Sequence, residues 1–373
     1  MKAIINAKII TEGTILTGYN LLYMKEIISV TKELPIWAEV IDAKGAYLSA
    51  GFIDLHIHGS NGADVMDATF EALTTISKSV LQTGTTSFLA TTMTMPKEDI
   101  VLALETIKQY TSKEGANIVG VHLEGPFIHT KKYGAQNPLY IQKPNIELIE
   151  PYMDIIKMIT LAPEVEGAEV FIKTLNKDYP KTVLSVGHSD ASYRETKESF
   201  EWGVSHATHL FNAMSPLHHR EPGVVGAVLD SDEVTCEIIA DKIHIHPLFF
   251  NVIHKLKKEK LLLVTDAMRA GCMRCGTYDL GGQEVIVKEG EARLLDGTLA
   301  GSVLMLNEAL RNFYESTEIS LPELIDMVTK IPAQKLGLNR GELKESYRAD
   351  MVLFDKKFNI LKTFVDGEVK FDA

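Results

Sequence analysis

Between residues 51 and 264, short apolar segments alternate with longer stretches of helical length. The apolar segments, each as long as a strand, are 51–57, 85–90, 118–123, 158–161, 183–186, 205–208, 235–239 and 261–264. The amphipathic stretches between them include 69–83, 96–113, 191–202 and 247–258. Strands and helices that alternate in this way predict a (β/α)₈ barrel of the TIM type. A doubly wound open sheet is the alternative, but the Gly-x-Gly-x-x-Gly turn that would support it is absent.

The two ends of the chain have a different pattern. Each contains short apolar runs separated by turn residues, and neither end can bury a hydrophobic face alone. The runs are 3–10, 20–24, 26–30 and 39–42 near the start, and 351–354, 360–365 and 368–371 near the end. The last two flank Asp366-Gly367, which is a strong hairpin signal. We therefore predict that residues 1–50 and 346–373 form one small β-sandwich domain, and that residues 51–345 form the barrel.

Residues 276–299 follow the last predicted barrel strand and are rich in glycine and in alternating apolar residues. This pattern predicts a β-hairpin inserted into the barrel. The stretches 302–315 and 321–330 then predict the helices that complete it.

Composition argues against several classes of function. The 373 residues carry a net charge of −12, whereas nucleic-acid backbones require a basic surface. The first residues lack the apolar stretch of a signal peptide, and no run approaches the ~18 apolar residues of a membrane span. The three cysteines, Cys236, Cys272 and Cys275, cannot form a disulfide framework. We therefore predict a cytoplasmic protein with no nucleic-acid or membrane partner, in which Cys272 and Cys275 are ordinary loop thiols.

Histidine and acidic residues stand at the C-terminal ends of most predicted strands. The first strand ends in His56-Ile57-His58, and two residues so spaced point to the same side of an extended chain. The other strand-end groups are Glu124, His188, His209, Asp241, His244 and Asp266. In a barrel these ends meet at one rim, where catalytic groups lie. Each residue alone is compatible with a structural role, but the set suits a divalent zinc, iron or manganese ion.

The stretches around these residues match a known pattern. They are GFIDLHIHG (51–59), HLEGPF (122–127), GHSDA (187–191), THLFNAM (208–214), REPG (220–223) and VTDAM (264–268). Their order of His-x-His, Glu, His, His and Asp resembles the amidohydrolase superfamily. The EGPF, HLFNAM and REPG pieces resemble its N-acetylglucosamine-6-phosphate deacetylase family. The resemblance covers nearly the whole chain, flanks included.

This resemblance implies a metal-dependent hydrolase in amino-sugar catabolism and cell-wall recycling. It would cleave the acetamide of N-acetylglucosamine 6-phosphate to glucosamine 6-phosphate and acetate, with Asp266 as the catalytic carboxylate. The principal metal ligands that it implies are Glu124, His188 and His209. Some family members lack the strand-one pair and hold one ion. Because this chain keeps His56 and His58, we expect a second ion bridged by Glu124, so that each subunit holds one or two.

The resemblance also implies how the amino-sugar phosphate is bound. His244 would contact the sugar or its carbonyl, while the phosphate would be bound by Asn212, the Ala213 backbone N–H and Arg220. In relatives this arginine comes from the neighbouring subunit, which implies a homodimer; its planar fork suits a phosphate.

The chain departs from the family pattern at two positions. Gln136 stands where many relatives have a histidine near the acetamide carbonyl, and a glutamine amide can donate a hydrogen bond but carries no charge. We expect Gln136 to line the substrate site and to polarise the acetamide carbonyl less than the histidine of relatives would. Lys242 stands where relatives commonly have glycine, which predicts an altered loop before His244.

Two other functions are compatible with a barrel of this kind. The first is another amidohydrolase, such as a cyclic-amide hydrolase or an amino-acid deacylase, which the REPG stretch and Asn212-Ala213 argue against. The second is a non-catalytic barrel that binds a sugar phosphate. The presence of every expected ligand together with Asp266 argues against that reading.

Overall fold

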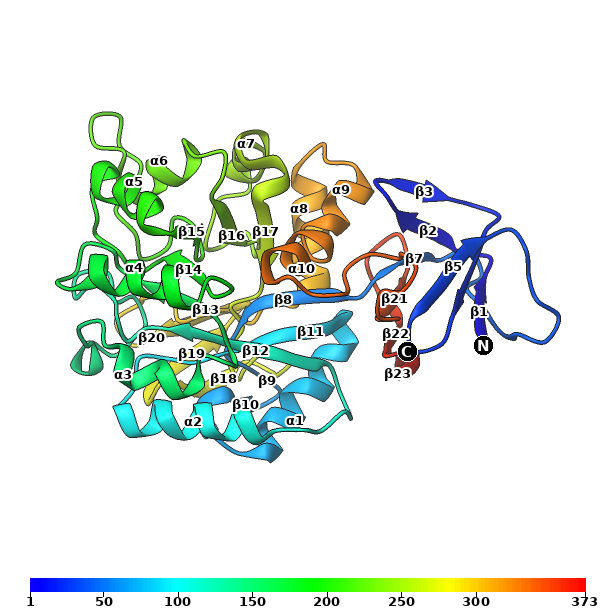
Figure 1. The fold of residues 1–373 in the computed structure, drawn as a ribbon, viewed down its shortest axis with the longest axis horizontal. Coiled ribbons are helices and arrows are strands. Elements are labelled where there is room, and N and C mark those ends of the chain that lie inside the picture. Colours follow the sequence, from blue (N-terminus) through cyan, green and yellow to red (C-terminus); the bar gives the residue numbers. More distant parts are fainter.

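The computed structural model describes residues 1–373 and contains the predicted barrel (Figure 1). Its eight parallel strands follow one another around the sheet in chain order. They are β8 (Phe52–Ile57), β11 (Thr85–Thr91), β12 (Asn117–Glu124), β13 (Ile156–Leu161), β14 (Val183–Val186), β15 (Val204–Ala207), β16 (Thr235–Ile239) and β17 (Leu261–Val264). The last strand returns to the first, because the Asp266 N–H donates to the carbonyl of His56 at 2.8 Å and Ile57 bridges Ala267. The prediction of a TIM-like barrel is confirmed.

Helices surround the barrel and bury its outer face. They are α1 (Phe70–Ser79), α2 (Lys97–Gln109), α3 (Ile146–Ile149), α4 (Ala168–Asp178), α5 (Tyr193–Trp202), α6 (Gly223–Leu229), α7 (Leu248–Lys257), α8 (Leu306–Ser316), α9 (Leu321–Asp326) and α10 (Lys330–Leu336). Local signals set where they begin: Thr69 accepts the N–H of Ala72, and Ser192 and Glu195 form a capping box. Short 3₁₀ turns lie at Val65–Asp67, Val80–Thr83, Pro138–Tyr140, Glu150–Tyr152 and Lys258–Lys260. No helix combines the length and the apolar composition that a bilayer crossing requires.

Both ends of the chain lie in the same small β unit beside the barrel, as Figure 1 shows. One sheet has the order β5-β4-β1-β6 and the other β23-β22-β21-β7-β2-β3. Their bounds are β1 (Lys2–Ile5), β2 (Lys8–Thr11), β3 (Thr14–Leu16), β4 (Asn20–Tyr23), β5 (Ile27–Thr31), β6 (Glu39–Asp42), β7 (Tyr47–Ala50), β21 (Met351–Phe354), β22 (Ile360–Val365) and β23 (Glu368–Asp372). The antiparallel pair of β7 with β21 joins the two flanks. The sheets share a separate core that includes Ile9, Leu48 and Phe364. The predicted boundaries at residues 50 and 346 stay predictions.

One strand of this unit was predicted wrongly. The run 3–10 is two strands in different sheets, because Asn6 lies between them with φ of 56°. Asparagine tolerates this left-handed conformation better than most residues, so the chain turns there rather than continuing straight.

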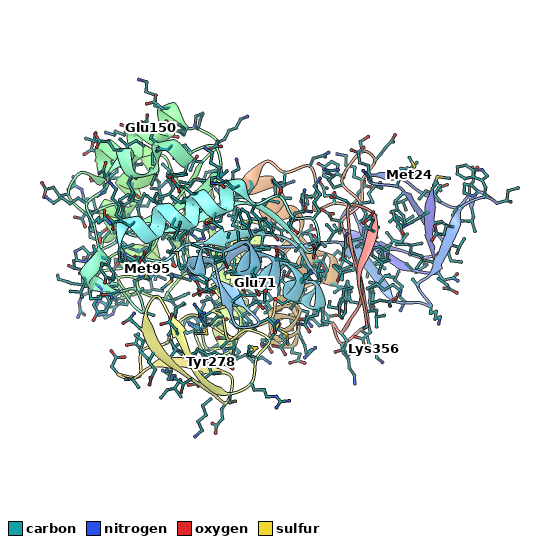
Figure 2. All side chains as sticks on the ribbon, turned by 90° about the horizontal axis from the view of Figure 1, so that it is seen from below. Met24, Glu71, Met95, Glu150, Tyr278 and Lys356 are labelled. Atoms are coloured by element: carbon teal, nitrogen blue, oxygen red, sulfur yellow. The ribbon has the colours of Figure 1, made fainter.

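The inserted segment is a three-stranded antiparallel sheet rather than a hairpin. It consists of β18 (Gly276–Leu280), β19 (Gln283–Lys288) and β20 (Glu291–Leu294). Leu280, Val285 and Val287 pack against Met93 and Met268 of the barrel rim in a small core of their own. Figure 2 shows Tyr278 of this sheet and Met24 of the terminal unit on different sides of the molecule. The insertion therefore packs on the barrel rim at Met93 and Met268, apart from the terminal unit. A minor two-stranded ribbon, β9 (Gly59–Ser60) with β10 (Ala63–Asp64), follows β8.

Candidate active site

The strand-end residues singled out in the sequence meet at one rim of the barrel. His56 lies on β8 with His58 just beyond it, Glu124 is the last residue of β12, and His188, His209 and Asp266 follow β14, β15 and β17. All six side chains are buried. The last three have positive φ values of 49°, 32° and 49°, respectively. Such a backbone costs a non-glycine residue of order 1–3 kcal/mol, a strain that is concentrated at functional sites.

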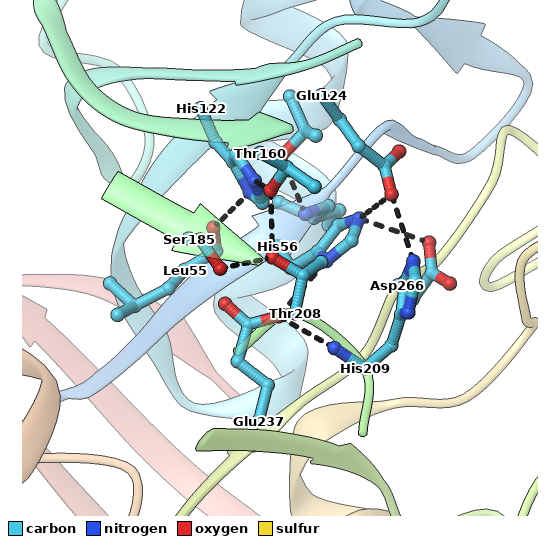
Figure 3. Close-up of polar contacts among 12 residues, drawn as sticks. Leu55, His56, His122, Glu124, Thr160, Ser185, Thr208, His209, Glu237 and Asp266 are labelled. Atoms are coloured by element: carbon cyan, nitrogen blue, oxygen red, sulfur yellow. Dashed lines mark hydrogen bonds and ion pairs between the residues drawn. The ribbon is translucent and has the colours of Figure 1, made fainter. Parts of the chain in front are cut away.

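These side chains form two adjoining clusters. In the first, Glu124 Oε1 lies 3.1 Å from His188 Nε2 and 3.0 Å from His209 Nε2. In the second, Asp266 Oδ1 lies 3.4 Å from His56 Nε2 and 3.3 Å from His58 Nε2. Glu124 connects the two, because its Oε2 lies 3.1 Å from His58 Nε2. Figure 3 shows Glu124, His56 and Asp266 turned toward one another.

The donor atoms in both clusters fit a metal ion. His56 Nδ1 faces Glu237 Oε2 at 3.1 Å, and His188 Nδ1 faces the carbonyl of Lys132 at 2.8 Å. These oxygens only accept, so both Nδ1 atoms carry protons, and the Nε2 atoms are the ones that face inward, free to hold either a proton or a metal ion. The Nε2 atoms of His188 and His209 then lie 3.1 Å apart, and those of His56 and His58 lie 3.3 Å apart. Imidazole nitrogens and carboxylates that converge at these distances need a positive charge between them, which a proton or a metal ion can supply. Imidazole with carboxylate is a donor set of zinc, iron or manganese.

The electrostatics of the buried groups lead to the same conclusion. Burial would raise the pKa of Glu124, but His56 and the hydrogen bonds from His188 and His209 hold it well below its ordinary value. Burial likewise opposes protonation of His58, yet Asp266 and Glu124 raise its pKa to about 9. The carboxylates of the pocket therefore favour positive charge strongly enough to oppose the free-energy cost of burying that charge away from water. Family and geometry together support a divalent metal at this site.

A cavity of about 340 Å³ opens directly over the clusters. Its walls come from the strand-end loops on one side and from the insertion on the other, where Leu280, Arg293 and Leu299 contribute. This volume lies in the range of small-molecule sites. Asp266 and His244 both line it. The insertion is also tied to the loop opposite, because Gln283 Nε2 donates to the carbonyl of Ala135 at 2.6 Å.

His244 is oriented by an acidic neighbour. Its Nδ1 lies 2.6 Å from Asp241 Oδ2, while Asp241 Oδ1 accepts the backbone N–H groups of Ile243 and His244 at 2.8 Å. The ring therefore presents Nε2 to the cavity. Lys242 has φ of 68°, the conformation that glycine adopts without cost, and its Nζ pairs with Glu315. Lys242, which stands where relatives commonly have glycine, therefore does not prevent the contact between Asp241 and His244.

Gln136 lies at the cavity but has its amide already engaged. Its Oε1 accepts the N–H of Thr94 at 2.6 Å, and its Nε2 donates to Glu124 Oε2 at 2.8 Å. The side chain is buried. It therefore holds Glu124 in place, a contact that the sequence did not indicate.

The residues expected at the phosphate are only partly brought together. Asn212 and Ala213 line the cavity, and the Ala213 N–H donates to no group of the chain. Arg220 does not line it: the residue is exposed, and its guanidinium hydrogen-bonds to His219 at 2.7 Å. Arg293 of β20 is instead the one lysine or arginine of the cavity wall, and its guanidinium is tied to Glu291 and to the carbonyl of Gly297.

Sequence reasoning missed the groups that support the site from below. Glu237 on β16 is fully buried between His56 and His206. Asp54 on β8 accepts the Thr265 hydroxyl at 2.6 Å, which ties the first strand to the last, and burial raises its pKa to about 7. The sequence contained a signal for both, namely an acidic residue inside an otherwise apolar strand. Such a residue is rarely buried without a hydrogen-bonding or charged partner, so each one predicts a partner nearby.

Three comparisons place this geometry among known proteins. Residues 47–370 match the amidohydrolase family. N-acetylglucosamine-6-phosphate deacetylase of Lysinibacillus sphaericus is 40% identical over 338 residues, 88% of this chain and 87% of that one. N-acetylgalactosamine-6-phosphate deacetylase of Escherichia coli O157:H7 is 34% identical over 370 residues, 97% of each chain. The crystal structure of N-acetylglucosamine-6-phosphate deacetylase from Pasteurella multocida superposes with a TM-score of 0.93 at 33% identity and covers 99% of both chains.

Proposed function

We propose that this chain, which belongs to the amidohydrolase family and within it to the N-acetylglucosamine-6-phosphate deacetylases, removes the acetyl group of N-acetylglucosamine 6-phosphate. The products are glucosamine 6-phosphate and acetate. The observation that carries the proposal is the position of Asp266, which contacts the histidine pair of one cluster and also lines the cavity above.

The residues of the two clusters would hold one divalent ion each. Glu124, His188 and His209 make one set, and His56, His58 and Asp266 make the other, with Glu124 close to both. When bound, such an ion supplies Lewis acidity, which makes water a stronger acid and polarises an amide carbonyl.

Asp266 moves the proton in this mechanism. Burial would raise the pKa of its carboxyl, but His56 and His58 lower it below the ordinary value, so Asp266 is ionised at neutral pH. It accepts the proton that water loses as the water oxygen bonds to the acetamide carbon. It then donates that proton to the sugar nitrogen as the C–N bond breaks. The amine leaves with that proton, while the second proton of the water stays on acetic acid and is then lost to the amine or to solvent, which gives acetate.

The remaining cavity residues would position the sugar. His244, oriented by Asp241, presents Nε2 to a sugar hydroxyl or the acetamide. The unengaged N–H of Ala213 would bind a phosphate oxygen. Asn212 Nδ2 donates to the carbonyls of His209 and Leu210 at 3.3 Å and 3.4 Å, and it would exchange one of these contacts for a second phosphate oxygen. Gln136 lines the wall, while its amide stays with Glu124.

The charge that the phosphate requires would come from Arg220 of a second copy. Support comes from its exposed position outside the cavity of its own chain. Nearby, Leu248, Phe249, Val252 and Leu256 form an exposed apolar stripe on α7, with Leu217 exposed in the Arg220 loop. A stripe of this kind favours association of two copies. We therefore propose a homodimer in which each subunit completes the phosphate site of the other.

An acetate-release assay tests the proposal. Purified, zinc-loaded protein would be given N-acetylglucosamine 6-phosphate, its galactosamine epimer and unphosphorylated N-acetylglucosamine. We expect the highest kcat/KM on the first sugar and the lowest on the last. Higher kcat/KM on the galactosamine epimer would change the proposed substrate, and no acetate from any of them would contradict the activity.

A further inference from the structure

Glu237 makes an unusual set of contacts beneath the metal-binding clusters. It lies on β16, is fully buried, and has no direct contact with the cavity. Its Oε2 accepts from His56 Nδ1 at 3.1 Å and from the backbone N–H of His209 at 3.4 Å, while its Oε1 accepts from His206 Nε2 at 3.0 Å. Figure 3 shows this carboxylate on the opposite side of the His56 ring from Glu124.

These contacts fix the protonation of His56. A carboxylate can only accept hydrogen bonds, so the ring nitrogen that faces Glu237 must carry the proton. The other nitrogen, Nε2, is then the one that can offer a lone pair to a metal ion, and it faces Glu124 and Asp266 at 3.5 Å and 3.4 Å. A carboxylate on the far nitrogen also makes an imidazole a more basic ligand.

The other three imidazoles of the clusters are held differently. His58 Nδ1 faces the carbonyl of Thr91 at 3.3 Å, and His188 Nδ1 faces the carbonyl of Lys132. His209 Nδ1 is buried without a partner. His56 is therefore the one imidazole of the clusters held by a charged group, and that group is itself locked by His206, whose Nδ1 lies 2.6 Å from the hydroxyl of Thr235.

We propose that Glu237 is a positioning residue that tunes the metal affinity of the His56 side of the site. It acts through His56 by setting its tautomer, its orientation and its basicity. The proposal rests on the metal site within the proposed function, but not on which sugar is the substrate. A buried carboxylate with only a structural role would affect folding stability and leave metal affinity unchanged. The proposal for Glu237 predicts a change in metal affinity instead.

Zinc titration of the metal-free protein tests this directly. Glu237→Gln removes one acceptor while keeping the shape of the side chain, and we expect about a 10- to 100-fold loss of Zn²⁺ affinity, as for other partners of ligating histidines. Turnover should fall while KM stays nearly unchanged, because Glu237 does not reach the substrate. If Glu237→Gln does not fold, Glu237→Asp keeps the charge but withdraws it from His56 and should give the same result.

The matched control is Asp350→Asn. Asp350 is another buried carboxylate, paired with Arg340 at 3.0 Å, away from the metal-binding clusters. We expect this variant to lower the melting temperature without changing Zn²⁺ affinity. A Glu237→Gln protein that binds Zn²⁺ within twofold of the wild type, or an equal loss in Asp350→Asn, would overturn the proposal.

A double-mutant cycle shows whether the effect passes through His56. In a His56→Ala background, Glu237→Gln should cause no further loss of Zn²⁺ affinity, because its route of action is already gone. Additive losses would contradict the proposal. The titration measures this contact even in a chain that released no acetate, so failure of the inference and failure of the proposed function are distinguishable.

Discussion

The two ends of the cavity differ in which parts of the fold supply their residues. At the metal end, six buried side chains come from strand ends of one barrel; Glu237 holds them from beneath, and Gln136 holds Glu124 from the cavity wall. At the end that we propose for the phosphate, Asn212 and Ala213 stand on a loop, and Arg220 is exposed and outside the cavity. The barrel thus fixes the chemistry within one chain. In the function that we propose, recognition of the charged part of the substrate depends on loops and on a second copy of the chain.

The largest expected effect is at the metal end. Asp266→Asn keeps the size of the side chain but removes the group that accepts and returns the proton. We expect kcat to fall on the order of 10²- to 10⁴-fold. The ion of the Glu124, His188 and His209 set should be retained, so zinc measured by mass spectrometry should not fall below one ion per subunit. Near-normal turnover in this variant would remove Asp266 from the mechanism.

Arg220→Ala tests the phosphate end, where the expected effect is smaller and confined to binding. A hydrogen bond to a charged group contributes about 1.5–3 kcal/mol, so KM for the phosphorylated sugar should rise roughly 10- to 150-fold. KM for the unphosphorylated sugar should not change. Arg293→Ala is the control, since Arg293 lies in the cavity wall but is already tied to Glu291 and Gly297. An equal rise in KM in both variants would place the phosphate near β20.

Mixed dimers decide whether Arg220 acts across subunits. When Arg220→Ala and Asp266→Asn proteins are combined, one site of each mixed dimer has an intact Asp266 and receives an intact arginine from its partner. At low substrate concentration the mixture should then exceed the sum of its parts. A rate equal to that sum would mean that Arg220 serves its own chain.

The same contrast explains how much the sequence revealed. Parallel strands share an edge, so His56, Glu124 and Asp266 could be brought together from their positions at strand ends alone. The left-handed backbone of His188 and His209 could not be foreseen, because tertiary contacts impose it against local preference. Glu237 was missed because it lies inside a strand, where only the folded barrel shows that His56 and His206 flank it.

The flanks and the insertion illustrate the same limit. The hairpin at Asp366-Gly367 was predictable because its turn is local, and both residues have positive φ. The break at Asn6 and the third strand of the insertion depend on which partner strand is available, which a single segment does not specify.

The smallest expected effect concerns Gln136, which lines the cavity and contacts Glu124. Gln136→Ala frees Glu124 Oε2 and leaves the Thr94 N–H without its acceptor. Because the amide supports a metal-binding carboxylate, we expect Zn²⁺ affinity to fall about tenfold, the lower end for such supporting contacts. Gln283→Ala is the matched control: it releases the same loop through Ala135 but does not touch Glu124. It should raise KM for the sugar and leave Zn²⁺ affinity unchanged. Equal losses of Zn²⁺ affinity in both variants would mean that the order of the loop, rather than the hydrogen bond to Glu124, supports the metal end.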